Sequence, residues 1–364
     1  QEKLDRGAAK LPYDSQFGFL PAVLDELRVP RESQILVFSK TSFQAARISP
    51  KTPRALYFND TVSIGYVPGG DVVEVLAQDP QQGVIFYTLD QDPNRKPQFI
   101  RHGDTCLQCH MNGSTLDVPG LVIRSVYPER SGMPHFHAGG FVTDHRSPLK
   151  ERWGGWYVTG HHGQQRHMGN AFAADRSKPN QLDFEGASNV EKLTGRYDTS
   201  LHLTPYSDIV ALMVIEHQAR VMNLLTRLNF ETRLAEHHQS LMTRLLGEAS
   251  PETRASTDRR IRQFSDELVD TLLFVNEAQL TEPVRGTSGF AERFAKGGSL
   301  REFDLKQRMF KYPLSYMIFS PAFDQLPPTA QRYVRQRMQK MLADPARADL
   351  LAIVKREKPG LLRP

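Results

Sequence analysis

The sequence predicts an α+β protein whose N-terminal half is rich in β-strands and whose C-terminal half is helical. Up to about residue 160, short runs of β-branched and aromatic residues alternate with turn signals such as Pro68-Gly69-Gly70. After Pro205, apolar residues recur at helical spacing over long stretches. A chain of 364 residues is long enough to bury the core of such a fold without disulfides or a structural metal.

Strands are expected throughout the first hundred residues, because short apolar runs there are separated by Pro, Gly or Asp-Pro signals. Their lengths match those of ordinary strands rather than helices. The predicted strands are Gln34–Phe38, Ala55–Phe58, Val62–Val67, Val72–Ala77, Val84–Leu89 and Gln98–Arg101.

The C-terminal half is expected to form a helical layer or bundle. A first long helix is predicted from a capping residue at Ser207 to Gly247, because apolar residues recur along it with helical period. The later helices are predicted from the same periodicity and, for the last of them, from a Pro-Pro start signal. They cover 253–279, 288–296, 303–311 and 328–342.

Between the two halves, residues 102–205 are rich in Gly, His, Arg and aromatic residues and show little periodicity. Eight of the 12 histidines lie between residues 102 and 167. A long irregular segment in a compact chain is usually functional, disordered or wrapped around a ligand. The chain therefore divides into a β-rich region (1–101), a loop-rich binding region (102–205) and a helical region (206–364), an arrangement compatible with one continuous domain.

Charge and hydropathy exclude some functional classes. The formal net charge of +5 comes from 46 Lys and Arg against 41 Asp and Glu, interspersed along the chain. Without a concentrated basic stripe or a known module, nucleic-acid binding is not expected. No apolar run approaches the roughly 20 residues that span a bilayer, so no membrane span is expected. A basic face that docks an acidic redox-partner protein remains open.

The two cysteines of the chain, Cys106 and Cys109, stand three positions apart, and His110 follows directly. A lone pair this close is better explained as a site than as a disulfide framework. The segment CLQCH resembles the haem-attachment motif of c-type cytochromes. On a helical turn, two such thiols can add to the vinyl groups of one porphyrin while the imidazole binds iron. One haem c per chain is therefore expected, with His110 as proximal iron ligand.

Two other kinds of site use a similar cysteine pair. A zinc site would need a fourth ligand, often from a second cysteine pair, and the sequence has none. A thioredoxin-like redox pair needs a strand and a following helix in a βαβ unit, whereas the flanking runs here belong to a β-rich region. Haem attachment is the favoured hypothesis.

The resemblance extends beyond the pentapeptide. The blocks RSVYP, SGMP, TDHRSP, RWGGWYVTG and HMGN resemble those of large, uncharacterised bacterial proteins that contain a cytochrome c domain. They begin at Arg124, Ser131, Thr143, Arg152 and His167. That family implies a haem motif at Cys106, Cys109 and His110 but brings no established activity. Small soluble cytochromes c carry the motif on the first helix of a compact all-α domain, whereas here a strand precedes it, so that fold is not expected.

The second axial position on the iron has four candidates. Met133 precedes a proline, as many methionine ligands of cytochromes do, although ordinary packing is the commoner role. His162 lies in a glycine-flanked loop that could approach a flat cofactor, and His167 follows in the same loop. His217 faces the apolar side of the first long helix, where a satisfied core histidine is the alternative to an axial ligand.

Residues around these candidates have supporting roles. Glu216 points about 100° away from His217 on the helix and is expected at the surface or in a helix-pairing contact. The tryptophans, Trp153 and Trp156, with Tyr157, form one aromatic block that serves either as core packing or as a wall of a haem pocket. Arginines that could pair with haem propionates are Arg124, Arg146, Arg152 and Arg166.

The expected function is that of an exported monohaem redox protein acting on a redox-partner protein. Haem c is attached outside the bacterial cytoplasm, and the chain begins with Gln rather than Met, so a periplasmic location after removal of a signal segment is expected. A haem-dependent oxidoreductase, a peroxidase-like enzyme and a haem-based gas or redox sensor are the alternatives. The single CxxCH argues against the two-haem peroxidase plan.

Overall fold

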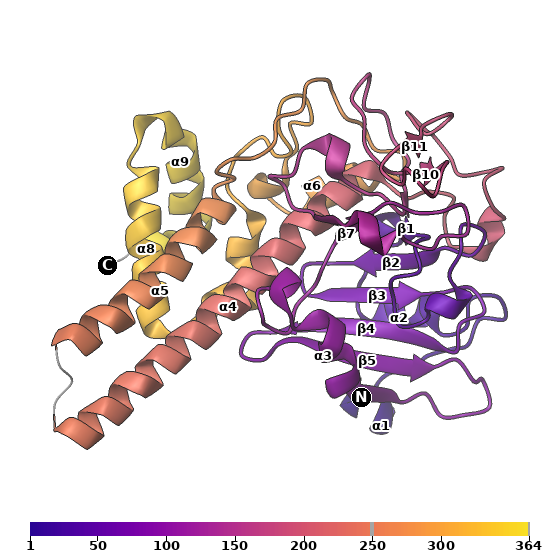
Figure 1. The fold of residues 1–364 in the computed structure, drawn as a ribbon. Helices are drawn as coiled ribbons and strands as arrows, with labels where there is room; N and C mark the ends of the chain where they lie inside the picture. The colour runs from indigo at the N-terminus through magenta and orange to yellow at the C-terminus, as the bar shows by residue number, and fades with distance from the viewer. Residues whose placement is uncertain (248–250, 363–364) are drawn as a thin grey trace.

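A computed structural model describes residues 1–247 and 251–362. Its N-terminal part is an antiparallel sheet in the order β6-β5-β4-β3-β2-β1-β9 (Figure 1). Two small hairpins, β7-β8 and β10-β11, lie outside it. The strands are β1 (Ile35–Val37), β2 (Arg54–Phe58), β3 (Val62–Tyr66), β4 (Val72–Asp79), β5 (Gly83–Asp90), β6 (Phe99–His102), β7 (Arg124–Val126), β8 (Gly140–Val142), β9 (Trp156–Tyr157), β10 (Phe172–Ala173) and β11 (Leu182–Asp183).

The predicted α+β class is confirmed, with a β-rich N-terminal half and a helical C-terminal part. β1 to β6 coincide with the six predicted strands to within a few residues at each end. The sequence analysis did not predict β9 as a strand. Trp156 and Tyr157 pair with Val37 and Leu36 and so extend the sheet beyond β1.

The two faces of the sheet carry different cores, because alternate side chains of a strand point to opposite faces. On one face, Tyr57, Ile64 and Val73 pack against the short helix α2 (Leu20–Glu26). On the other face, Phe58 and Phe86 belong to a larger core that continues into the helical region. One hydrophobic core therefore runs from the sheet through the C-terminal half of the chain.

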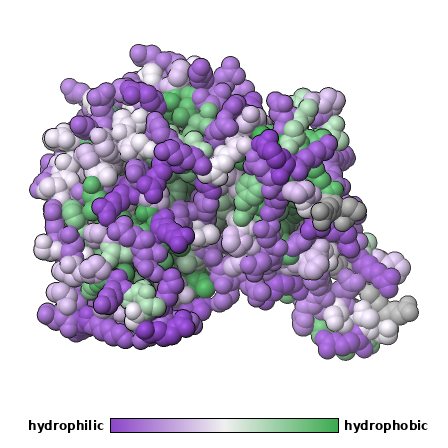
Figure 2. All heavy atoms as spheres, turned by 180° about the vertical axis from the view of Figure 1, so that it is seen from behind, coloured by the Kyte–Doolittle hydropathy of each residue, from purple (hydrophilic) through white to green (hydrophobic). Residues whose placement is uncertain are grey.

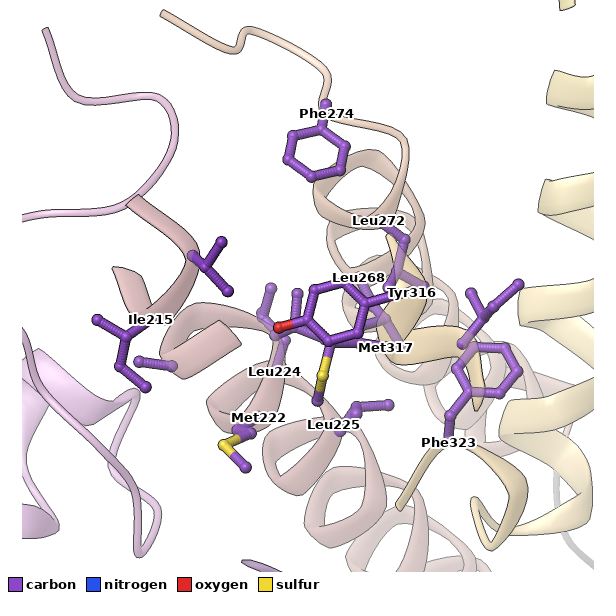
Figure 3. Packing of buried hydrophobic residues seen from close by; sticks show 14 of the residues in the cluster. Ile215, Met222, Leu224, Leu225, Leu268, Leu272, Phe274, Tyr316, Met317 and Phe323 are labelled. Carbon is purple, nitrogen blue, oxygen red and sulfur yellow. The ribbon is translucent and has the colours of Figure 1, made fainter. Parts of the chain in front are cut away.

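The helical region is built around the antiparallel pair α4 and α5, whose far ends form an arm that projects from the body (Figure 1). Leu224 and Leu225 of α4 face Leu268 and Leu272 of α5 across an apolar interface, and Met317 lies beside them (Figure 3). The helices are α1 (Glu2–Asp5), α2 (Leu20–Glu26), α3 (Asp104–His110), α4 (Ile209–Leu246), α5 (Pro251–Leu272), α6 (Phe290–Ala295), α7 (Pro321–Asp324), α8 (Pro328–Leu342) and α9 (Ala348–Glu357).

Several helix boundaries differ from the sequence expectations. The N-cap of α4 is Asp208, one residue after the predicted Ser207, and its carboxylate accepts hydrogen bonds from the first-turn amides. α5 ends at Leu272 instead of 279, because Phe274 and Asn276 adopt left-handed backbone angles that end a helix. The predicted helix over 303–311 is wrong. There, Phe303 and Phe310 pair as an antiparallel bridge around a turn.

The surface shows no sign of a membrane span. None of the helices within residues 1–247 and 251–362 is both long and apolar enough to cross a bilayer. From behind, hydrophilic side chains cover most of the molecule, apolar ones are scattered between them, and the α4–α5 arm projects from the body (Figure 2).

Asp208 is expected to be a strong single determinant of stability. Its buried carboxylate accepts hydrogen bonds from the amides of Val210 and Ala211 at 2.8 and 3.3 Å and from Thr287 and Ser288 at 2.8 Å each. Asp208→Ala removes the cap and leaves buried donors unpaired, so it should lower the free energy of unfolding by about 3 kcal/mol in urea titrations.

The matched control is Asp198→Ala, which removes an exposed cap that accepts one amide bond from Ser200 at 3.1 Å. We expect a loss of under about 1 kcal/mol for this variant. Equal losses for the two variants would contradict a special role for Asp208.

Candidate functional site

The cysteine pair lies on α3, a seven-residue helix that follows the edge strand β6. Cys106 is half-buried and packs with Leu107 against the main core, whereas Cys109 is exposed. Both thiols are free, so the pair is not used as a disulfide. The helix lies in front of the sheet near β4 and β5 (Figure 1). The three candidate side chains, Cys106, Cys109 and His110, therefore come from one short helix that is anchored on one side and open on the other.

The His110 ring is held in one orientation by a hydrogen bond to a distant loop. Its Nδ1–H donates to the carbonyl oxygen of Gly120 at 2.9 Å, and the Gly120 amide donates to the His110 carbonyl at 2.9 Å. The ring also contacts that of Phe86 on β5, with centroids 4.8 Å apart. Because Nδ1 carries the proton, Nε2 is the unprotonated nitrogen, and it has no hydrogen-bond partner among the described residues. Burial lowers the pKa of His110, which favours this neutral form.

Helix α4 fixes the position of that acceptor loop. The side chain of Asn223 accepts a hydrogen bond from the Leu121 amide at 2.9 Å and donates to the Leu121 carbonyl at 2.7 Å. The close approach needs a glycine at 120, because a Cβ there would lie 2.2 Å from Asn223 Oδ1. Asn223 thus positions Gly120, and Gly120 positions His110.

A buried ion pair lies under the site on the same sheet face. Arg54 on β2 pairs with Glu74 on β4, and Gln44 also donates to Glu74, at 2.8 Å. Arg54 lowers the pKa of His110 and Glu74 raises it, both after the larger effect of burial. The pKa of the Cys106 thiol is raised, mainly by burial and secondly by the negative charge of Glu74. Arg54 Nε has no hydrogen-bond partner among the described residues. Arg54, Glu74 and Gln44 carry no sequence motif and were not among the predicted site residues.

Exposed apolar side chains surround the helix. Ile100, on β6 immediately before it, is 51% exposed, and Met111, immediately after it, is 46% exposed. Val142 on β8 is 50% exposed and lies opposite Arg124, whose guanidinium contacts Ser114 just beyond the helix. Singly exposed apolar side chains are common on protein surfaces, so these three do not by themselves mark a ligand site.

The structure does not place His217 beside His110. His217 is fully buried, and both ring nitrogens have partners: Nδ1 lies 3.1 Å from His145 Nδ1, and Nε2 lies 2.7 Å from Ser315 Oγ. Its ring stacks on Phe274 at 4.3 Å. Burial holds the pKa of His217 well below its usual value. His217 therefore matches the alternative interpretation of its sequence position, a core histidine whose ring nitrogens have hydrogen-bond partners inside the protein.

His162 and His167 also lie away from His110. They form one buried cluster beside β9, with ring centroids 4.6 Å apart, and His162 uses both nitrogens in bonds with Gln165 and Asn189. β9 is five positions from β5 in the sheet order, which is roughly 24 Å at the usual strand spacing. His110 contacts β5, so the two histidines belong to a different part of the molecule.

Met133 is exposed on the loop between β7 and β8, and its side chain is 44% accessible. The neighbouring Gly132 accepts a hydrogen bond from Lys40, just after β1. That strand is four positions from β5. Among the four distal candidates, none is brought next to His110 in the described residues.

The supporting residues also find different partners. Glu216, expected at the surface or in a helix-pairing contact, is fully buried, where it pairs with Arg152 at 3.2 Å and accepts a hydrogen bond from Thr143 at 2.5 Å. Burial raises its pKa to about 7 against the opposing effect of Arg152. Trp153 and Trp156 belong to the main core.

The four candidate arginines for propionates are also separated by the fold. Arg152 is engaged by Glu216 and Arg146 by Asp144, at 2.6 Å, while Arg166 covers the ring of Phe184. Only Arg124 of the four lies beside the cysteine helix, through its contact with Ser114. Arg124 is exposed, so its guanidinium is accessible.

Comparisons with known proteins add no assignment. The chain matches no protein-family model, no curated protein and no solved structure. Within the described residues, no group of three or more His, Cys, Asp or Glu side chains is arranged to hold a metal ion.

Buried neutral histidines should make the protein sensitive to acid. Burial lowers the pKa of His145 and His167 to about 3 and that of His202 to about 4. In the unfolded chain the same side chains take up a proton near pH 6.5, whereas in the folded protein they stay neutral to well below that pH. Stability is therefore lost as the pH falls from about 6.5. Each such histidine should cost about 2 kcal/mol between pH 7 and pH 5.

His202→Gln tests this effect, because an amide can replace the hydrogen bond from Nε2 to the Pro53 carbonyl at 2.8 Å without titrating. The loss of unfolding free energy between pH 7 and 5, measured in urea, should shrink by about 2 kcal/mol in this variant. His137→Gln, at an exposed position, should leave it unchanged. An unaltered pH dependence in His202→Gln would contradict the explanation.

Proposed function

We propose that this protein is an exported bacterial redox protein with one covalently attached haem c. Cys106 and Cys109 would form the two thioether bonds, and His110 would be the proximal iron ligand. The observation that supports this most directly is the hydrogen bond from His110 Nδ1 to Gly120, because it leaves Nε2 unprotonated and unpaired on the helical turn that carries both thiols. A zinc site is less well supported, since among the described residues no group of three or more His, Cys, Asp or Glu side chains is arranged to hold a metal ion.

Haem c, when bound, supplies a one-electron redox centre at its iron. The residues of this chain contribute orientation and electrostatics. Gly120 keeps the His110 ring in one tautomer, and Phe86 supports one face of the ring. The buried Arg54–Glu74 pair places opposite charges near the site, so replacing either residue alone would alter the local potential.

A second candidate function is a haem-dependent enzyme or sensor in which the distal side of the iron is open to a small molecule. One observation favours it over simple electron transfer. His217 and His162 each use both ring nitrogens in bonds with residues other than His110. Without a protein ligand on the distal side, iron binds carbon monoxide, nitric oxide or peroxide readily.

A periplasmic location and a redox-partner protein belong to the same proposal, because haem c is attached outside the cytoplasm. Arg124, on β7, is exposed and contacts Ser114 just beyond the cysteine helix. Its positive charge suits an acidic partner surface at the point where electrons would enter or leave.

Covalent attachment is tested by intact mass. Protein expressed with a haem c maturation system should exceed the polypeptide mass by one haem, and acidified acetone should not extract the pigment. Cys106→Ala with Cys109→Ala should abolish attachment, whereas His137→Gln, an exposed control, should not change it. A mass equal to the bare chain, with stoichiometric zinc, would overturn the proposal.

The distal side is tested by spectroscopy of the haem-loaded protein. We expect the ferrous form to bind carbon monoxide readily, because His217 and His162 are engaged by other residues and no described contact joins any of the four candidates to His110. His217→Asn, His162→Asn, His167→Asn and Met133→Leu should leave the visible spectrum unchanged. A low-spin wild-type spectrum that becomes high-spin in one of these variants would identify a distal ligand and restore the electron-transfer function.

A further inference from the structure

A second candidate binding site lies between the sheet and the helical region, formed by residues outside the cysteine helix and its acceptor loop. It is a cavity of about 210 Å³ bounded by the segment after α2, the β2–β3 turn, α4 and α6. This volume is below the roughly 300–1,000 Å³ of sites for drug-sized ligands, so an occupant would be small. Ligand sites are often found where two parts of a fold meet.

Three arginines from distant parts of the chain line this cavity: Arg28, Arg293 and Arg301. Arg301 pairs with Asp60 and is held between the rings of Phe294 and Tyr316, at 4.6 and 4.3 Å. Arg293 pairs with Glu32 at 3.3 Å. Arg28 is exposed and has no acidic partner among the described residues. The available carboxylates thus neutralise two of the three guanidinium groups and leave one positive charge at the opening.

The wall of the cavity is aromatic. Phe290 lies 5.6 Å from Phe58 and 5.4 Å from Phe294, measured between ring centroids. All three rings line the cavity, and Gln218 is already engaged, because it donates to the Asn59 carbonyl at 2.7 Å and accepts from Tyr316 at 2.7 Å. The cavity is therefore lined by mutually tilted aromatic rings beside an unneutralised guanidinium group.

We propose that this cavity binds a small organic carboxylate with a flat apolar body. The apolar body packs against Phe290 and Phe294, and the carboxylate pairs with Arg28, whose planar guanidinium matches its two oxygens. Inorganic phosphate lacks the apolar body and gains only the charge interaction. The site is independent of the haem proposal, because none of its lining residues belongs to α3 or to the loop that holds His110.

Titration calorimetry on the full chain as purified tests the proposal, with sodium benzoate as probe and inorganic phosphate for comparison. Benzoate should bind with one site per chain and at least tenfold more tightly than phosphate. Arg28→Gln should weaken benzoate binding about tenfold, because it removes a charge-assisted hydrogen bond. Arg28→Lys, which keeps the charge and loses the planar fork, should weaken it less.

The control variant is Arg95→Gln, which removes an exposed arginine paired with Asp90 and Asp92 away from the cavity. It should bind benzoate as the wild type does. The absence of benzoate binding at millimolar concentration would overturn the proposal, as would phosphate binding that equals that of benzoate. Benzoate binding that is unchanged in Arg28→Gln would also overturn it.

Discussion

The arrangement of this protein depends on the burial of α4 on nearly all sides. From Ile209 to Leu228 its side chains are almost all enclosed, between the sheet, the loop-rich middle of the chain and the other helices. A helix buried all round usually carries apolar residues only. Here it also carries buried Glu216, His217 and Asn223. Because a buried polar group is costly without a partner, each of these residues requires another segment to stand in one position.

These requirements connect the regions of the chain. Glu216 fixes the segment that carries Arg152, His217 fixes His145 and Ser315, and Asn223 fixes the loop at Leu121. Through Gly120, the last of these contacts reaches the ring of His110. The orientation of the proposed iron ligand thus depends on a helix more than a hundred positions later in the chain. The segment that carries the cysteine pair is thus held in place by the helical half of the chain.

Features determined by local sequence were predictable. The strands β1 to β6 and the helix α8 follow from short-range patterns and turn signals, and they were placed to within a few residues. Features that depend on residues far away in the sequence were not predictable from local patterns. The turn at 303–311 looks helical by periodicity, but tertiary pairing of Phe303 with Phe310 decides its conformation. Glu216 looks like a surface charge because the helix pattern cannot reveal that Arg152 lies opposite it. β9 has only two residues, too few for a periodic signal.

The candidate site divides in the same way. Cys106, Cys109 and His110 are recognisable because all three functions must come from adjacent turns of one helix, so their spacing is a local constraint. The second ligand of an iron has no such constraint, since any segment of the chain can supply it. A histidine on an apolar helix face satisfies the pattern equally well as a ligand and as a buried hydrogen-bonding residue. In the structure both ring nitrogens of His217 have partners, His145 and Ser315. Breaking these bonds to bind iron would leave buried polar groups unpaired, so the burial that stabilises α4 also opposes the use of His217 as a ligand.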